Sequence, residues 1–475
     1  MTRTSTDRWS AEGGRDGEPL DEADLRLRQR RRFVAVVAVL AVVCGLFGVL
    51  THLQGPKLTD VQVDASAVVE RSGQQLRLFS NQALAHVDPD QVVVSPAAPF
   101  TVETSGDVVS VQFTDRLRYD TDYRVSVSGV SSIYQRQTSD LEARFSTEQA
   151  VTWRIVHGRD GAEDSLEQAD LKGGAERRTV WSAPRIQAYE VFDSAVAVLT
   201  DDGAQSTLSL VSLDGVAAET LPLPLPEGPG LVTQLGADRA TTTLAFSWQP
   251  EGSEQETLYT LPLQGQRAVA PVTSIAGEPL TVLDWQFVPG LDSVVAQATD
   301  EQVTLFDLSG AAPPRPLGTF VALQGVSLDG RGIVAATALQ AFRVDLSTGE
   351  QTPIPFSAVE GQTPFRGELV AVGATEYVQQ VALPTDGGTS FSSLIVLDDE
   401  QEARVVFRPP SGSSEIEGFS VSPNGQFLAV ETATATSPTD YTYTIDPTPA
   451  EVTTTVVDLA SGAVVASFLG HAASW

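Results

Sequence analysis

Histidine and cysteine, the side chains that most often hold transition metals, are few and widely separated in this sequence. The histidines are His52, His86, His157 and His471, no two of them at the spacing of a local metal-binding motif, and the only cysteine is Cys44. Zinc and iron–sulfur sites draw on several Cys or His ligands, commonly paired within a few residues. We therefore predict no metal site of these kinds.

Other chemistry with a local sequence motif is also absent. The sequence has no Gly-x-Ser-x-Gly nucleophile elbow and no Gly-x-x-x-x-Gly-Lys phosphate-binding loop. Acidic residues cluster at Asp201-Asp202 and at Asp398-Asp399-Glu400, but neither cluster follows the pattern of a calcium-binding loop, so we interpret both as solvated turns. No catalytic, cofactor-binding or metal-ligating residue is predicted, and the sequence does not identify the binding surface.

The elements that would position any site are mostly short strands. Between residues 56 and 147, apolar and polar residues alternate in about seven runs, such as Leu76–Phe79, Val108–Phe113 and Tyr123–Val127. Turn residues such as Asp88-Pro89-Asp90 separate the runs. Short alternating runs with frequent turns are typical of an antiparallel β-sandwich.

Residues 56–148 resemble a bacterial Ig-like domain of the SbsA type. The resemblance rests on Leu78-Phe79-Ser80-Asn81, on Val94-Ser95-Pro96, on the run from Leu117 to Val125 and on the closing Phe145-Ser146-Thr147. It implies a spacer or adhesion module on a cell surface, and no catalytic residue comes with it.

From residue 150 to residue 475 a turn recurs with a period of about 45 residues, which is typical of a β-propeller. The turn is Asp-Leu, one or two further residues and Gly, in which Asp accepts hydrogen bonds from the turn backbone and Gly supplies a positive φ. Seven turns indicate seven blades, with six or eight as alternatives. The full and weaker copies are Asp170–Gly173, Leu213–Gly215, Leu263–Gly265, Asp307–Gly310, Asp345–Gly349, Leu397–Asp399 and Asp458–Gly462.

A second repeated unit supports the propeller. Val421–Gly425 precedes the apolar run Phe427–Val430, and Val326–Gly330 precedes Ile333–Ala335. These units resemble the turn and inner strand of TolB-type and WD-like propellers. The sequence contains no Trp-Asp dipeptide, so we do not expect a strict WD repeat.

Two segments of the propeller region stand apart from the repeat. Thr432–Thr455 is rich in Thr and Pro, and we interpret it as an insertion that forms a projecting hairpin or a flexible loop, open to glycosylation. The apolar strands Val151–Val156 and Val464–Phe468 lie at the two ends of the region. We predict that these two strands lie in the same blade or in adjacent blades, which would close the ring.

The longest apolar segment is Phe33–Leu50, eighteen residues without a charge, preceded by five arginines between Arg26 and Arg32. As a helix it would be about 27 Å long, close to the thickness of a bilayer core. No Ala-x-Ala cleavage site follows, so a retained anchor is favoured over a cleaved export signal. The arginine flank predicts a cytoplasmic N-terminus. We therefore predict a plasma-membrane helix over residues 33–53.

Composition limits the partners. The 475 residues carry a formal charge of −31, while the tail up to Arg32 is close to neutral, so the negative charge lies beyond the expected anchor. An acidic surface repels nucleic acid and anionic lipid. The scarcity of lysine, with only Lys57 and Lys172, is typical of a high-GC bacterium such as an actinobacterium.

Together these features predict a mainly β protein in four parts: a disordered cytoplasmic tail with a basic end (1–32), a transmembrane helix (33–53), an Ig-like β-sandwich (56–148) and a β-propeller (150–475). The predicted function is extracytoplasmic binding or scaffolding in the bacterial cell envelope, without a cofactor, with a non-enzymatic role favoured, and with a protein or cell-wall polysaccharide as partner. The alternative is a glycoside hydrolase or lyase with carboxylates in the propeller channel, since such pairs leave no local motif. A sensor is disfavoured because the tail is short.

Overall fold

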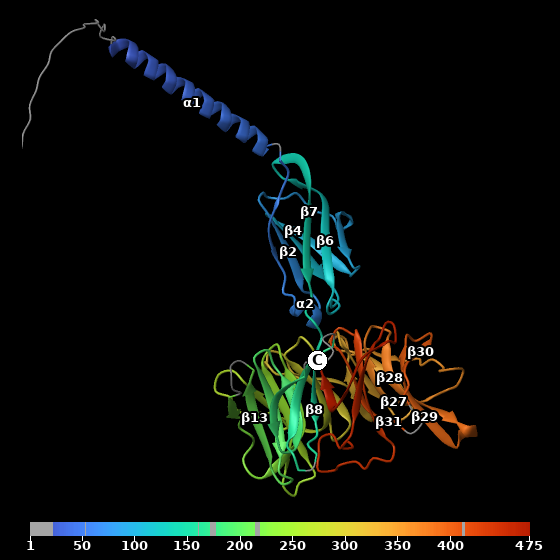
Figure 1. Cartoon of the computed structure of the whole chain (residues 1–475). Coiled ribbons are helices and arrows are strands. Elements are labelled where there is room, and N and C mark those ends of the chain that lie inside the picture. Colours follow the sequence, from blue (N-terminus) through green and yellow to red (C-terminus); the bar gives the residue numbers. More distant parts are fainter. Residues whose placement is uncertain (1–21, 53, 160, 172–176, 214–218, 411–413) are drawn as a thin grey trace, which may run out of the picture.

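The structure is a computed structural model of the chain, and it describes residues 22–52, 54–159, 161–171, 177–213, 219–410 and 414–475. The side chains of residues 22–29, 46–52 and 386 are outside this description. A long helix, a two-sheet β unit and a ring of β-sheets follow one another along the chain (Figure 1). The prediction of a mainly β fold is confirmed.

Helix α1 spans Glu22–His52 and therefore begins within the segment that was expected to be a disordered tail. Residues 22–32 are rich in Glu, Ala, Leu, Arg and Gln, which favour a helix, and this extends α1 ahead of Phe33. Among the described residues, no helix combines the length and the apolar character that crossing a membrane requires. Residues 1–21 of the expected tail, residue 53 and the side chains of 46–52 lie outside the described residues. The anchor stays a prediction.

The two-sheet unit, which we call the sandwich, contains seven strands, as expected. They are β1 (Leu58–Gln62), β2 (Gln75–Ser80), β3 (Val92–Ser95), β4 (Phe100–Ser105), β5 (Val108–Phe113), β6 (Asp122–Ser132) and β7 (Gln135–Ser146). One antiparallel sheet has the order β1-β2-β5-β4 and the other β3-β6-β7. Alternate residues such as Leu76, Leu78, Val109 and Val111 are fully buried, because side chains on one face of each strand point inward. Two short helical turns, α2 (Ala67–Glu70) and η1 (Pro89–Gln91), join the strands.

Residues 151–474 form five four-stranded antiparallel sheets and one eight-stranded sheet, counted over the described residues. The eight-stranded sheet consists of two groups of four strands, joined where Glu256 and Thr257 pair with Val282 and Thr281, so the strands divide into seven groups of four, the blades of a propeller. The strands of blades 1 to 4 are β35 (His471–Ser474), β8 (Val151–Val156), β9 (Asp164–Asp170) and β10 (Arg178–Ala183); β11 (Ile186–Val191), β12 (Ala195–Asp201), β13 (Ser206–Ser212) and β14 (Thr220–Pro222); β15 (Gly230–Asp238), β16 (Thr243–Pro250), β17 (Glu256–Pro262) and β18 (Ala270–Pro271); β19 (Thr281–Phe287), β20 (Ser293–Ala298), β21 (Gln302–Asp307) and β22 (Arg315–Thr319).

The strands of blades 5 to 7 are β23 (Ala322–Val326), β24 (Gly332–Ala336), β25 (Ala341–Asp345) and β26 (Gln351–Pro353); β27 (Phe365–Ala371), β28 (Tyr377–Thr385), β29 (Ser390–Asp398) and β30 (Ala403–Phe407); β31 (Ser414–Val421), β32 (Phe427–Thr434), β33 (Thr453–Asp458) and β34 (Val464–Leu469), with a short helical turn η2 (Asp386–Gly388) in blade 6. The first strands of most neighbouring blades contact one another, from β11 through β27 and between β31 and β35, so the first strands surround the axis of the ring. The prediction of a β-propeller is confirmed, and its described strands divide into seven groups of four.

The second strand of each blade explains the apolar runs of the sequence. In β12, β16, β20 and β32, consecutive residues are buried, because both faces of the strand pack against neighbouring blades. The run Phe427–Val430, expected as an inner strand, belongs to β32, the second strand of its blade.

The repeated Asp-Leu-Gly turns follow the third strand of a blade. In three full copies, Asp307, Asp345 and Asp458 accept hydrogen bonds from backbone N–H groups of the turn, and the glycine that ends the turn has a φ of 71–76°. The proposed role of Asp and Gly in these turns is therefore confirmed. Residues 172–176 and 214–218, within two of the other copies, are outside the described residues.

The ring is closed by the C-terminal strand. β35 pairs with β8, so both ends of the propeller region contribute to blade 1, and β34 lies in the adjacent blade 7. The prediction that Val151–Val156 and Val464–Phe468 lie in the same or adjacent blades is confirmed.

The two faces of the propeller differ in what covers them. We call the face formed by the turns between first and second strands and between third and fourth strands the proximal face, because the sandwich sits there (Figure 1). The opposite face, formed by loops between second and third strands and between blades, is the distal face.

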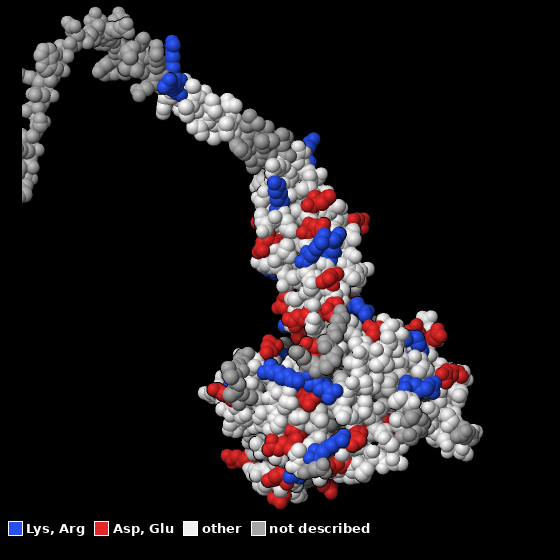
Figure 2. Space-filling view, viewed as in Figure 1, with Lys and Arg blue, Asp and Glu red and all other residues white. Residues whose placement is uncertain are grey.

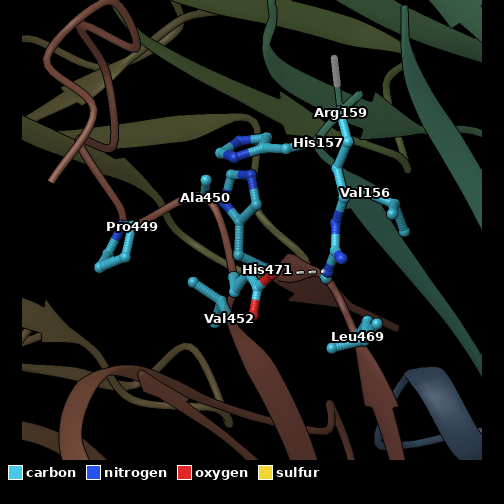
Figure 3. A pocket seen from close by; sticks show the side chains of 10 residues that line it. Val156, His157, Arg159, Pro449, Ala450, Val452, Leu469 and His471 are labelled. Carbon is cyan, nitrogen blue, oxygen red and sulfur yellow. Dashed lines mark ion pairs between the residues drawn. The ribbon is translucent and has the colours of Figure 1, made fainter. Parts of the chain in front are cut away.

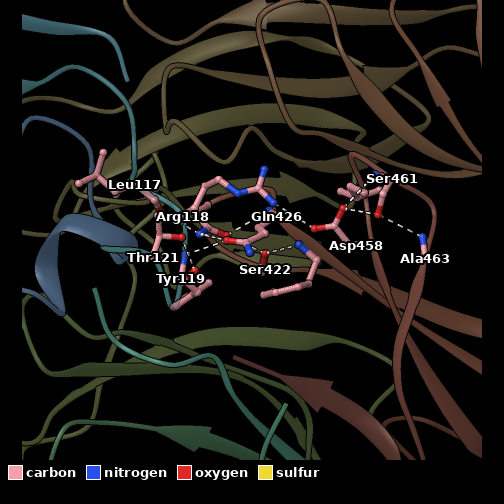
Figure 4. A network of polar contacts seen from close by, with 12 residues as sticks. Leu117, Arg118, Tyr119, Thr121, Ser422, Gln426, Asp458, Ser461 and Ala463 are labelled. Atoms are coloured by element: carbon pink, nitrogen blue, oxygen red, sulfur yellow. Dashed lines mark hydrogen bonds and ion pairs between the residues drawn. The ribbon is translucent and has the colours of Figure 1, made fainter. Parts of the chain in front are cut away.

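Polar contacts fix the sandwich to the proximal face (Figure 4). The Tyr119 backbone N–H donates to Gln426 Oε1 at 2.7 Å, and the side chain of Asn424 donates to the Leu117 carbonyl at 2.9 Å. Arg118 forms an ion pair of 3.0 Å with Asp458.

An aromatic stack reinforces this joint. The ring of Tyr119 stacks on Phe427 with centroids 6.3 Å apart, and Phe427 stacks on Trp475 at 5.9 Å. Such pairs contribute about 1 kcal/mol beyond the area they bury. The buried core of the sandwich is consequently continuous with that of blades 7 and 1.

Candidate functional site at the distal end of the channel

The insertion forms the loop between β32 and β33, residues 435–452, and this loop crosses the distal face. The Gln187 side chain of β11 donates to the Thr442 carbonyl at 3.0 Å and accepts from the Thr444 backbone N–H at 2.7 Å. Tyr443 is buried and its hydroxyl lies 2.9 Å from Asp164. The expectation of a projecting hairpin or flexible loop is wrong, because the loop packs back onto blades 1 and 2.

The insertion brings Asp446 to a group of acidic side chains. Glu368 of β27 and Glu417 of β31 lie on innermost strands of neighbouring blades, near Asp446. Burial raises the pKa of Glu368, and the negative charge of Asp446 raises it further. The pKa of Glu417 is likewise raised, first by burial and then by Glu415 and Asp446. The distal end of the channel is therefore acidic.

Asp446 also approaches two buried side chains, Glu431 of β32 and His471 of β35. One ligand-type atom from each of the three residues lies within 4.8 Å of the others. His471 is only 2% exposed, and neither of its ring nitrogens has a hydrogen-bond partner. Its Nδ1 lies 3.7 Å from Asp446 Oδ2, too far for a hydrogen bond. This group could hold a cation.

His157, at the end of β8, completes the surroundings (Figure 3). Its ring stacks on Tyr443 at 4.0 Å and meets the ring of His471 edge-on at 4.3 Å. Burial lowers the pKa of His157 to about 4, and the neighbouring His471 adds to the effect. Both histidines line a cavity of about 140 Å³, at whose rim Arg159 and Glu451 form an ion pair of 3.1 Å. His157 is therefore neutral at physiological pH.

The sequence did not reveal this pairing of histidines. They are 314 positions apart, and only the pairing of β8 with β35 brings them together. The predicted closure of the ring was the one feature of the sequence that could have indicated this proximity, because His157 follows one closing strand and His471 begins the other. His86 is exposed in the sandwich beside Asp88, and His52 ends α1, where its side chain is outside the described residues.

The two acidic clusters that were expected to be solvated turns are only partly so. Asp202 and Asp399 accept hydrogen bonds from backbone N–H groups in exposed turns. Asp201 and Asp398 are buried instead, and Asp398 accepts two hydrogen bonds from Ser357. Asp398 therefore links β29 to the segment between β26 and β27, and Asp201 accepts a weak hydrogen bond of 3.5 Å from the Thr444 hydroxyl of the insertion.

No family model and no curated protein matches the chain. Among solved structures, the chain is similar to β-propellers. A putative 6-phosphogluconolactonase from Bacteroides uniformis ATCC 8492 has 13% identity and a TM-score of 0.41, over 69% of this chain and 96% of that one. The WD40 domain of Toxoplasma gondii coronin has 11% identity and a TM-score of 0.38, over 60% and 70%.

A further similar structure is an oligogalacturonate lyase in complex with manganese, with 13% identity and a TM-score of 0.39, over 76% of this chain and 94% of that one. Enzymes and non-enzymes both occur among these structures, and similarities of this size carry no argument about activity. The assignment of the propeller rests on the strand order of the chain itself.

Proposed function

We propose that the chain is a membrane-anchored, extracytoplasmic binding or scaffold protein of the bacterial cell envelope. In this proposal α1 anchors it in the plasma membrane, with the arginines on the cytoplasmic side, and the sandwich is an Ig-like spacer of the SbsA type. The propeller then presents its distal face away from the membrane.

The observation that carries the proposal is the difference between the two faces. The proximal face is fixed to the sandwich and exposes only a few large apolar side chains, such as Leu291 and Val464, whereas the distal face exposes more of them. Exposed apolar groups that cluster and are rimmed by polar residues mark interaction surfaces, and Phe365 and Phe391 form such a cluster. Those on the distal face are Ile275, Val321, Leu339, Phe365, Phe391 and Tyr441.

Two of these residues, Phe365 and Phe391, contact each other and form a small exposed aromatic cluster that a partner could bind. The rings of Phe365 and Phe391 meet edge-on with centroids 5.2 Å apart, while both remain more than half exposed. Aromatic side chains held by strands of one blade, as here by β27 and β29, lose little entropy on binding and often dominate interface energies. Together with the acidic channel mouth, they favour a protein partner with basic residues over a cell-wall polysaccharide.

Nucleic acid is disfavoured as a partner by the charge of −31. Acidic side chains are prominent at the joint and toward the distal end (Figure 2).

A site-specific crosslinking experiment tests this proposal. A photo-crosslinking residue in place of Tyr441, in the full-length chain in its native cells, should yield a discrete crosslinked product. The same residue in place of Leu291, which is half exposed on the proximal face, is the matched control and should yield none. Products that are equal at both positions, or absent at Tyr441, would contradict binding through the distal face.

A second function is favoured by one specific observation, the raised pKa values of Glu368 and Glu417. A carboxyl with a raised pKa beside an ionised one is the arrangement of glycoside hydrolases. This alternative predicts that the intact chain releases reducing ends from cell-wall polysaccharide and that Glu368→Gln or Glu417→Gln abolishes the release. If the intact chain releases none, the hydrolase alternative fails.

A further inference from the structure

We propose that Glu431, Asp446 and His471 bind one divalent transition-metal ion, Zn²⁺ or Mn²⁺. The proposal concerns the inside of the propeller and does not depend on what the distal face binds.

The first argument is the buried, unpartnered histidine. An imidazole whose two nitrogens are both buried without a hydrogen bond loses the free energy of hydration without compensation. His471 is in this position, with its Nδ1 directed toward Asp446 and within reach of Glu431. A metal ion bonded to Nδ1 would give this buried nitrogen the partner that it lacks.

The second argument is distance. Ligand atoms that share a tetrahedral ion at bond lengths near 2.1 Å lie roughly 3.4 Å from one another. The separation of 3.7 Å between His471 Nδ1 and Asp446 Oδ2 already approaches this value, and all three ligand atoms lie within 4.8 Å. Only small side-chain adjustments are needed, and the Asp446 side chain, half exposed on the insertion, is free to make them.

The third argument is the donor set. One imidazole nitrogen with two carboxylates suits Zn²⁺ or Mn²⁺, whereas Ca²⁺ and Mg²⁺ prefer oxygen ligands alone. Glu431 Oε1 accepts a hydrogen bond from the Ala473 backbone N–H at 2.9 Å, which orients the carboxylate. Fixed orientation of a ligand by such outer contacts is usual at metal sites.

The ion would join three segments that are far apart in sequence. His471 begins the closing strand β35, Glu431 lies in β32 of blade 7, and Asp446 lies in the insertion. β35 pairs with β8 only through His471↔Ile155 and Ser474↔Trp153, with an irregularity between them. A bound ion would therefore strengthen the closure of the ring and hold the insertion across the channel.

Calorimetric titration of the full-length chain, stripped with a chelator and desalted, tests the site. Zn²⁺ or Mn²⁺ should bind at one ion per chain and raise the thermal midpoint of the propeller, and Ca²⁺ and Mg²⁺ should not. Asp446→Asn and His471→Asn should each weaken binding about tenfold or more, since even loss of an outer contact costs 10–100-fold. Asp446→Asn keeps the fold intact because this side chain is half exposed.

Glu451→Gln is the matched control. It removes a carboxylate from the same insertion and the same cavity rim without changing a proposed ligand, so its affinity should equal that of the unmodified chain. The proposal is overturned if neither ion binds saturably, if Ca²⁺ binds as well as Zn²⁺ and Mn²⁺, or if Asp446→Asn binds the ions as the unmodified chain does.

Discussion

At the scale of single residues, the channel wall contains a carboxyl group whose pKa is raised and which is not part of the proposed metal site. Glu190 lies in β11, and burial raises its pKa from 4.5 to about 7, an effect that Arg239 partly offsets. Between these pH values the folded chain keeps a proton that the unfolded chain has released. The free energy of unfolding therefore falls as pH rises from about 4.5 to about 7.

Glu190→Gln removes this dependence. The variant should be more stable than the unmodified chain above pH 7, and the difference should shrink as pH falls and vanish near pH 4.5. Thermal midpoints measured between pH 5 and 8.5 check this, with Glu227→Gln on an exposed loop as control. A difference that does not change with pH would show that Glu190 is ionised throughout.

A comparison of the turn residues with the channel residues shows which roles can be predicted from the sequence before the structure is known. Asp345 accepts hydrogen bonds from residues two and three positions ahead, and these lower its pKa to about 2, so its role was readable from Asp345–Gly349 alone. Glu368 has no such local partner among the described residues. Its raised pKa depends on burial and on the charge of Asp446, which reaches it only in the closed ring, so no local sequence pattern predicts it.

At the scale of elements, the closing strand is the most consequential. Without β35, blade 1 would lose its innermost strand and β8 would become an unpaired edge against the channel. Deleting residues 471–475 should therefore lower the thermal midpoint of the whole propeller and reduce its cooperativity, as calorimetry would show. Trp475→Ala, which removes only the end of the aromatic stack, is the control. A deletion variant that keeps the full midpoint would mean that the ring is not held by this strand.

The joint between sandwich and propeller is the second element that can be tested. Gln426→Ala removes the acceptor of the Tyr119 N–H, and Arg118→Ala removes the ion pair with Asp458, so the double variant should weaken the joint by about 1–2 kcal/mol. Limited proteolysis should then cut faster near residue 149.

Arg124→Ala is the control for the joint, because Arg124 pairs with Glu142 within the sandwich. Equal cleavage rates for the double variant and for this control would show that the joint does not depend on these contacts.

Repetition explains why the elements were predictable and the joint was not. Seven similar turns after seven third strands mark the blades independently, so the blade count could be read from the sequence. The joint occurs once, and it pairs Tyr119 with residues more than 300 positions away. A single long-range contact of this kind has no periodic signal.

At the scale of the whole molecule, the parts are arranged as a stalk and a head, with the C-terminus at the joint between them (Figure 1). The sandwich therefore sets which face of the propeller is free. If α1 lies in the membrane, the distal face points away from it. The proposed function depends on this orientation more than on any single side chain.

The most direct test of the account is the topology of the chain in intact cells. Protease added to wall-stripped cells that express the full-length chain with an N-terminal epitope should remove the sandwich and propeller, and the epitope should remain protected until the cells are lysed. Protection of the propeller in intact cells, or its release into the medium without protease, would contradict an anchored extracytoplasmic binding protein.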